Sequence, residues 1–237
     1  MNYEQKFKYG DSEINVIVEF RKRKHFSLIV YPDLRVVARV PLKSKPARVE
    51  TIIQKKLRWI TKKIDYFNEL EPILPPREFV SGETHYYLGR PYMLRIQSGV
   101  KVKIEVIDNF IEMKLPVPGD NKKAEKIMLD WYKQRAKELL IQRIEKYLPG
   151  FLDLGAAKPE VKFRKMKSRW GSCSRKNIIT LNTELIKAHY YSSDYVVVHE
   201  LCHLIHLSHN KNFYNLLHNQ MPDWKKRKKL LEKVVLR

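Results

Sequence analysis

Residues able to perform metal chemistry are concentrated in one apolar segment, Tyr195-Val-Val-Val-His-Glu-Leu-Cys-His-Leu-Ile-His-Leu-Ser-His209. It contains the pattern His199-Glu200-x-x-His203 in a helix-like sequence. Histidines four residues apart project from one helix face, so both rings can reach a single cation. The carboxylate of Glu200 can then reach a water on that cation without binding the ion. The pattern predicts a catalytic zinc site in which Glu200 takes the proton of the water that attacks a carbonyl group.

A catalytic zinc also needs a third protein ligand, and two further histidines follow the motif. His209 lies six residues after His203, the interval at which metzincin-type peptidases place their third ligand after a glycine. Here His206 occupies the glycine position, so the chain must leave the helix differently. His206 would lie on the same helix face as His199 and His203, whereas a third ligand usually approaches from another direction. We therefore predict His209 as the third ligand and interpret His206 as a neighbouring or surface group.

This segment also has interpretations other than a catalytic site. A short His-Glu-x-x-His pattern can arise by chance, and most histidines on apolar helices are simply hydrogen-bonded. The run Val196–Val198 indicates a core helix, where unmetallated His and Glu side chains would be poorly compensated. A structural zinc would need four protein ligands and no base, and Glu200 argues against it. Cys202, within the motif, is interpreted as a small core residue.

The loop Lys167–Ser174 contains Trp-Gly-Ser-Cys and has two interpretations. Arg169 or Ser172 could lie near a substrate in a cleft beside the metal. Alternatively the loop is a hairpin whose Trp170 fills the core. The sequence favours neither interpretation.

The rest of the chain indicates strands first and helices later, which is typical of an α+β fold. Period-two alternation predicts strands within residues 12–41 and 79–116, and apolar residues three or four apart predict helices at 45–70 and 122–147. Pro72, Pro75 and Pro76 should follow the first helix as a connector, and Pro149-Gly150 should end the second. The last third predicts shorter elements: strands at 161–166 and 178–181, and helices at 191–206, 213–219 and 224–234.

The turn Pro118-Gly119-Asp120 is a candidate domain boundary. It divides the chain into a strand-rich N-terminal region with a crossing helix, residues 1–118, and a catalytic core, residues 119–237.

Composition restricts the compartment and the partners. The 237 residues carry a net charge of +21, which indicates nucleic acid, an acidic partner, a membrane surface or simply a solvated basic surface. Nucleic acid is therefore one possible partner, and the charge alone does not decide between these interpretations. No apolar run is long enough to span a membrane, the first residues do not look like a secretory signal, and only two cysteines occur. We expect a cytoplasmic protein without a membrane partner.

Three motifs in this order resemble the YgjP-like family of predicted zinc metallopeptidases: Trp170-Gly-Ser-Cys173, then Ile179-Thr-Leu-Asn182, then His199 to His209. Weaker similarity extends through most of the chain, including Trp59-Ile-Thr-Lys-Lys63. The resemblance implies a zincin-like core after about residue 120, in which His199, His203 and His209 hold zinc and Glu200 is the acid/base. The chain is also similar to SprT-like zinc proteases that act near DNA, which would give the positive charge a role.

These observations favour a zinc peptidase acting on a protein or peptide substrate. An extended substrate would pair with an edge strand beside the active helix, and Lys176–Leu181 is the candidate strand. Two alternatives stay open: a nucleic-acid-associated zinc protein whose proteolysis is confined to DNA-bound partners, and a structural zinc protein without turnover.

Overall fold

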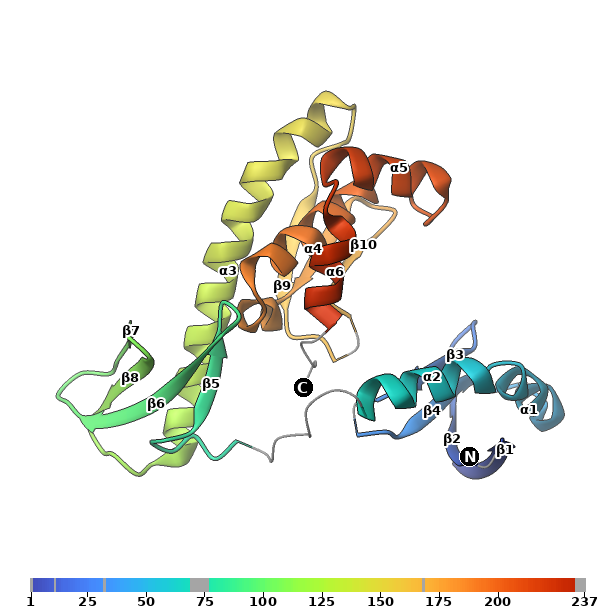
Figure 1. Cartoon of the computed structure of the whole chain (residues 1–237), viewed down its shortest axis with the longest axis horizontal. Helices are drawn as coiled ribbons and strands as arrows, with labels where there is room; N and C mark the ends of the chain where they lie inside the picture. Colours follow the sequence, from blue (N-terminus) through green and yellow to red (C-terminus); the bar gives the residue numbers. More distant parts are fainter. Residues whose placement is uncertain (1, 11, 32, 69–76, 168, 233–237) are drawn as a thin grey trace. The chain divides into compact units, whose positions relative to one another are not determined.

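The computed structural model describes residues 2–10, 12–31, 33–68, 77–167 and 169–232. The chain divides into two compact units, Met1–Pro75 and Pro76–Arg237, coloured blue to cyan and green to red in Figure 1. The predicted proline connector lies at this division, and its residues 69–76 are outside the described residues. The strands predicted within 79–116 therefore belong with the C-terminal unit, whereas the sequence had suggested a boundary at 118–119.

The N-terminal unit is a four-stranded sheet covered by two helices. The strands are β1 (Asn2–Tyr9), β2 (Ser12–Arg21), β3 (Ser27–Val30) and β4 (Val36–Pro41), in the order β1-β2-β4-β3 with β2 and β4 parallel. The single helix predicted at 45–70 is two helices, α1 (Pro46–Gln54) and α2 (Leu57–Asn68). Their buried residues Ile53 and Ile60 pack with Val16 of the sheet in one core, which explains the helical spacing of apolar residues.

The C-terminal unit begins with a second four-stranded sheet. Its strands are β5 (Thr84–Tyr87), β6 (Arg90–Ser98), β7 (Lys103–Ile107) and β8 (Phe110–Leu115), in the order β5-β6-β8-β7. Leu94, Ile111 and Met113 of this sheet are buried in one core with Met128 and Ala124 of the following helix. The sheet therefore packs against the first turns of that helix.

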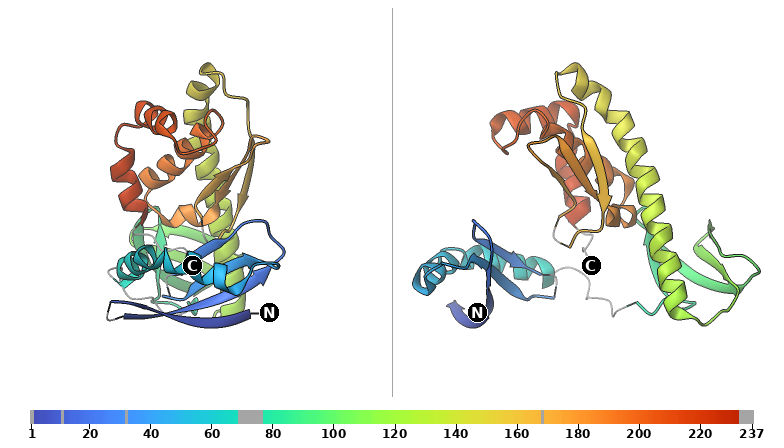
Figure 2. Two further views of the ribbon diagram at one scale, coloured as in Figure 1. Left: turned by 90° about the vertical axis from the view of Figure 1, so that its right-hand side faces the viewer. Right: turned by 180° about the vertical axis from the view of Figure 1, so that it is seen from behind.

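The long helix α3 (Asn121–Asp153) extends from this sheet to the opposite end of the unit (Figures 1 and 2). The side chain of Asp120 caps its start by accepting from the backbone N–H of Lys123 at 3.0 Å. The predicted end at Pro149-Gly150 is wrong, because α3 continues through both residues to Asp153. Phe151, in this last turn, is fully buried, so its packing offsets the cost of a proline near the helix end.

The last third builds a small sheet and three helices. The strands are β9 (Glu160–Arg164), β10 (Gly171–Cys173) and β11 (Ile178–Asn182), in the order β10-β11-β9. A short 3₁₀ helix, η1 (Thr183–Lys187), leads to the helices α4 (Tyr190–Cys202), α5 (Lys211–Gln220) and α6 (Trp224–Glu232). Strands and helices together make an α+β fold, as predicted.

The prediction that Lys176–Leu181 forms an edge strand is wrong. β11 lies at the centre of the small sheet, antiparallel to β10 and parallel to β9, so both of its edges are occupied. β10 is the edge strand that packs against α4.

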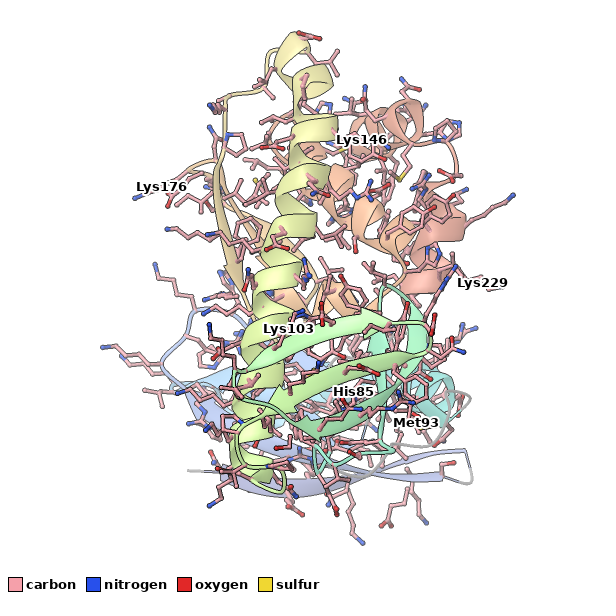
Figure 3. The ribbon with its side chains drawn as sticks, turned by 90° about the vertical axis from the view of Figure 1, so that its left-hand side faces the viewer. His85, Met93, Lys103, Lys146, Lys176 and Lys229 are labelled. Atoms are coloured by element: carbon pink, nitrogen blue, oxygen red, sulfur yellow. The ribbon has the colours of Figure 1, made fainter. Side chains whose placement is uncertain are left out.

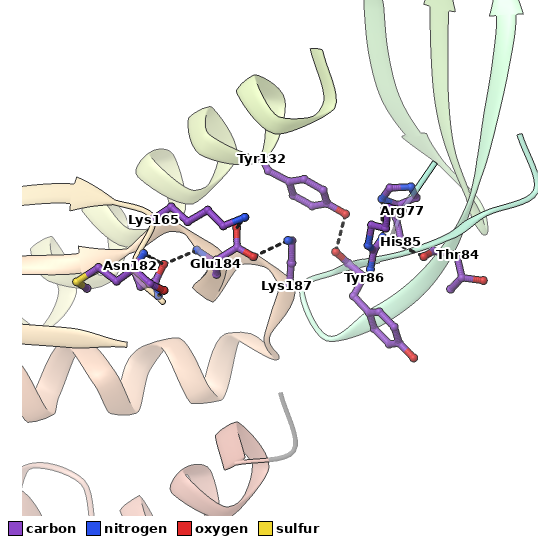
Figure 4. A network of polar contacts seen from close by, with 10 residues as sticks. Arg77, Thr84, His85, Tyr86, Tyr132, Lys165, Asn182, Glu184 and Lys187 are labelled. Carbon is purple, nitrogen blue, oxygen red and sulfur yellow. Dashed lines mark hydrogen bonds and ion pairs between the residues drawn. The ribbon is translucent and has the colours of Figure 1, made fainter. Parts of the chain in front are cut away.

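A polar junction joins η1, α3 and β5 (Figure 4). The Tyr132 hydroxyl on α3 donates to the Tyr86 carbonyl at 2.8 Å, and Lys187 on η1 donates to Glu184. The backbone N–H of Leu88 also donates to the Ile186 carbonyl at 2.8 Å. These contacts fix the chain immediately before α4, the helix that carries the His-Glu-x-x-His motif.

Candidate metal centre

The helix α4 presents the motif from the core of the C-terminal unit. Val198 and Leu201 are fully buried, and they hold the opposite side of the helix in the apolar interior. The helix ends at Cys202, four residues before the predicted end at His206. Bonds of the i→i+3 type, from the N–H of His203 to the Glu200 carbonyl and from Leu204 to Leu201, tighten the chain there. The tighter turn directs the following residues out of the helix without the glycine that metzincins use.

The three predicted ligand histidines converge. His209 Nε2 lies 3.0 Å from His199 Nε2 and 3.1 Å from His203 Nε2. Among the described residues these three form a group whose ligand atoms all lie within 4.8 Å of one another. Nitrogens bound tetrahedrally to one zinc at ~2.0–2.1 Å would be roughly 3.3 Å apart. The spacing therefore fits a shared cation, and the imidazole of His206 is outside the group.

The protonation of the rings also suits a metal. Burial, followed by the neighbouring histidines His203 and His209, lowers the pKa of His199 to about 3. Burial likewise lowers the pKa of His203. The neutral imidazole is the form that binds metal ions, so the lowered pKa values of His199 and His203 favour metal binding by these two rings. His203 Nδ1 lies 3.0 Å from the His206 carbonyl, and donation of its proton there leaves Nε2 as the free lone pair.

Phe213 supports all three rings and was not identified from the sequence. Its fully buried ring lies 5.0 Å from that of His199 and 4.6 Å from those of His203 and His209, measured between centroids. Asn210 caps α5 by accepting from the Phe213 N–H at 3.0 Å, which fixes the chain directly after His209. The only hint in the sequence was Asn210, a residue type that often begins a helix, followed three residues later by the apolar Phe213.

Glu200 extends its side chain from α4 toward Gly171 of the edge strand β10. Its side chain is 5% exposed, and its Oε2 has no hydrogen-bond partner among the described residues. Burial raises the pKa of Glu200 to about 8, and the positive charge of Arg169 acts in the opposite direction. A buried carboxylate with a free oxygen is poised to exchange a proton.

Each of the two interpretations of the Trp170–Cys173 loop agrees with part of the structure. The ring of Trp170 packs on the core, as the hairpin interpretation expected. Gly171 contacts the Glu200 side chain, and the Glu200 charge contributes to raising the pKa of Cys173, after burial, to about 11. The loop therefore also borders the site. Cys202 is fully buried, as expected of a core residue.

Comparison with known proteins assigns the family. Residues 24–234 match the sequence model described as YgjP-like, metallopeptidase domain. The chain belongs to the YgjP-like family. The resemblance seen in the sequence is thus confirmed, and so is the prediction of a metallopeptidase. The family match does not establish that the metal is zinc, which residues bind it, or what Glu200 does.

Other comparisons add little to the YgjP-like assignment. No curated protein matches the chain. Among solved structures, the metallopeptidase zymogen jannalysin of Methanocaldococcus jannaschii shares 18% sequence identity over 42% of this chain and 97% of its own, with a TM-score of 0.33. Among the described residues, no helix is long and apolar enough to cross a membrane.

Proposed function

We propose that this YgjP-like protein is a zinc endopeptidase in which His199, His203 and His209 hold the metal and Glu200 is the general base. The convergence of three Nε2 atoms next to a buried carboxylate supports this proposal most directly. Imidazole ligands suit zinc, copper, iron and nickel, and three of them with an adjacent glutamate are the set that metzincin-type zinc peptidases use. The two free cysteines suit a reducing compartment, so we propose the cytoplasm as its location.

The residues divide the work of peptide hydrolysis. When bound, a zinc ion would supply a Lewis acid that polarises the scissile carbonyl and lowers the pKa of a water molecule toward about 7. Glu200 takes the proton of the attacking water and returns it to the leaving amine. The nearby dication would favour the carboxylate form of Glu200, against the effect of burial alone.

The edge strand β10 is the surface on which the substrate backbone would lie. Among the strands of the described residues it pairs with β11 alone, so its other edge would receive an extended peptide. Because Gly171 contacts Glu200, a peptide paired to β10 would pass directly beside the base. β10 takes the role that the sequence had suggested for Lys176–Leu181.

A structural zinc is less well supported. A structural site is closed by four protein ligands, whereas the His199 group contains three among the described residues. Glu200, beside them, would have no purpose in a closed site.

The substitution Glu200→Gln tests the mechanism. It keeps the size of the side chain and removes the base, so kcat/KM for an unfolded protein substrate should fall by about 10²- to 10⁴-fold. Zinc measured by elemental analysis should stay at the wild-type amount per chain. Glu145→Gln, at an exposed position of α3, is the matched control and should retain activity. Wild-type turnover by Glu200→Gln would exclude Glu200 as the base.

A further inference from the structure

Positive charge is concentrated in one short stretch beside the candidate active site. Residues 158–176 contain eight Lys and Arg and a single acidic residue, Glu160, a net charge of +7. The whole of residues 76–237 contains 31 basic and 17 acidic residues, a net charge of +14. Half of the excess charge of the C-terminal unit is therefore carried by β9 and by the loops on either side of β10.

These side chains share one face of the small sheet. Ser172, Thr180 and Lys162 are paired in register across β10, β11 and β9, so they project from the same face. Their neighbours Ile179 and Leu181 are buried and point to the opposite face, which packs on the core. The face that carries Lys162 is thus the outer one, and it continues to the edge strand β10.

A shallow groove of about 400 Å³ runs over this outer face. Three cations line it together with small polar and apolar groups: Lys162, Arg164, Arg169, Ser172, Cys173, Ser174, Ile178 and Thr180. An adjoining hollow shares Arg164 and Arg169 and adds Lys165 and Lys167. We call the groove and the adjoining hollow together the basic groove. The residues that line it include no aspartate or glutamate.

Most of these cations are not neutralised within the chain. Lys162 is paired with Glu160 at 3.0 Å, and Lys165 is 3.9 Å from Glu184. Arg164 and Lys167 form no ion pair among the described residues, and the charge of Arg169 acts on buried Glu200 without a salt bridge to it. Figure 3 shows that Lys176, just beyond the groove, projects into solvent. The groove therefore has positive charge available for an external anion.

We propose that the basic groove selects peptide substrates that carry acidic side chains, an inference that rests on the proposed peptidase function. A peptide paired with β10 would extend the sheet, and every second side chain would point to the outer face. Those side chains would lie beside Ser172, at the mouth of the groove. Aspartate or glutamate at these alternate positions meets Arg164 and Arg169, whereas lysine or arginine there is repelled.

Nucleic acid is the competing polyanion, and the shape of the groove favours a peptide. Single-stranded nucleic acid is usually bound by exposed aromatic rings on which bases stack. The aromatic residues of this sheet region, Phe163 and Trp170, instead pack on the core side. The groove is also lined by Ser172 and Cys173 of β10, the strand along which the substrate backbone would lie.

Cleavage of matched peptides tests the proposal. Cleavage sites in an unfolded protein would first define a neutral substrate, and two glutamates two residues apart would then replace two glutamines in it. We expect kcat/KM to rise about three- to tenfold for the glutamate peptide, since each exposed ion pair contributes ~0.2–1 kcal/mol. The double variant Lys162→Gln/Arg164→Gln should lose this preference, and Lys122→Gln/Lys126→Gln, which removes equal charge from an exposed turn of α3, should keep it.

Direct binding separates this inference from the proposed function. Fluorescence anisotropy with Glu200→Gln protein measures affinity for the glutamate peptide, the glutamine peptide and a DNA duplex without requiring turnover. Tighter binding of the glutamate peptide that is lost in the Lys162/Arg164 variant supports the groove even if no peptide is hydrolysed. Equal affinity for both peptides overturns it even if hydrolysis is rapid. DNA that displaces the glutamate peptide and binds more tightly would identify the groove as a nucleic-acid site and also overturn the proposal.

Discussion

Gly171 lies against the carboxyl group of Glu200 so closely that no other residue would fit without moving it. A β-carbon at position 171 would be 2.6 Å from Glu200 Oε1, 2.7 Å from its Cγ and 2.9 Å from its Cδ. Such distances are far below van der Waals contact. The edge strand β10 and the Glu200 side chain on α4 are therefore fitted to each other, and the glycine of the Trp-Gly-Ser-Cys motif is required by a side chain 29 positions later in the sequence.

Gly171→Ala should therefore displace the Glu200 carboxylate while leaving the histidines in place. We expect kcat to fall at least tenfold, because a displacement of the base by about 1 Å is costly. Bound metal should be unchanged, and the free energy of unfolding should fall by about 1–3 kcal/mol, as for other overpacked sites. Gly150→Ala, where the new carbon would meet its nearest neighbour at 3.6 Å, is the control and should remain active. Wild-type kcat in Gly171→Ala would show that the contact does not position the base.

Removal of the metal should lower thermal stability through the three converging histidines. A ligand present at a thousand times its Kd stabilises the folded state by about 4 kcal/mol, which for a unit of this size is a Tm shift on the order of 10 °C. Differential scanning fluorimetry with and without a chelator measures this shift. His209→Ala should abolish it, whereas His206→Ala should retain it because that imidazole is outside the cluster. Loss of the shift in His206→Ala alone would reverse the assignment of the third ligand.

The local part of the site could be predicted because it depends on helix geometry. His199 and His203 are four residues apart, and any α-helix brings such a pair to one face. Glu200 follows from the same pattern. The convergence of His209 with them was anticipated from an interval of six residues, although the sequence did not reveal how the chain would turn. That turn depends on i→i+3 bonds after Cys202 and on the contact between His203 Nδ1 and the His206 carbonyl.

The non-local part could not be predicted in the same way. β10 has only three residues, too few for a period-two pattern to indicate a strand. Without it, β11 looked like an edge strand, although it is paired on both sides. Helix α3 continues through Pro149 because Phe151 is buried, and burial of a distant residue is not visible in the local sequence. The packing of Phe213 against the three histidine rings could not be predicted for the same reason.

Asp194 should contribute strongly to the stability of the active-site helix. This residue of α4 is 2% exposed, and its Oδ2 accepts from the Tyr147 hydroxyl at 2.9 Å and from Arg227 Nη1 at 3.3 Å. Arg143 Nε lies 3.4 Å from Oδ1, so the carboxylate links α4 to α3 and α6. Asp194→Asn leaves Arg143 facing a neutral amide, while Arg227 keeps its ion pair with Asp223 at 2.9 Å, and the substitution should cost about 3 kcal/mol in urea unfolding. Tyr147→Phe, which removes one hydrogen bond, should cost only about 1 kcal/mol. Equal losses in the two variants would argue against a charge-centred junction.

His85 should make the protein less stable in mild acid. Its side chain is fully buried, and Arg77 Nη1 lies 2.7 Å from its Nδ1, a donation that only a neutral imidazole can accept. Burial, then the charges of Arg77 and Lys187, lowers the pKa of His85 to about 3. The unfolded chain, in which histidine titrates near 6.5, therefore binds the extra proton first as the pH falls.

The free energy of unfolding should consequently decrease from about pH 6.5 toward about pH 3, by at most ~1.4 kcal/mol per pH unit from this residue. His85→Gln should be less stable than the wild type at pH 7 but should show a shallower pH dependence in that window. Urea unfolding at several pH values, with a chelator in both samples so that the metal centre contributes equally, measures the difference in slope. Identical slopes would mean that the imidazole becomes protonated within the folded protein, and the donation from Arg77 would then have to be broken without loss of stability.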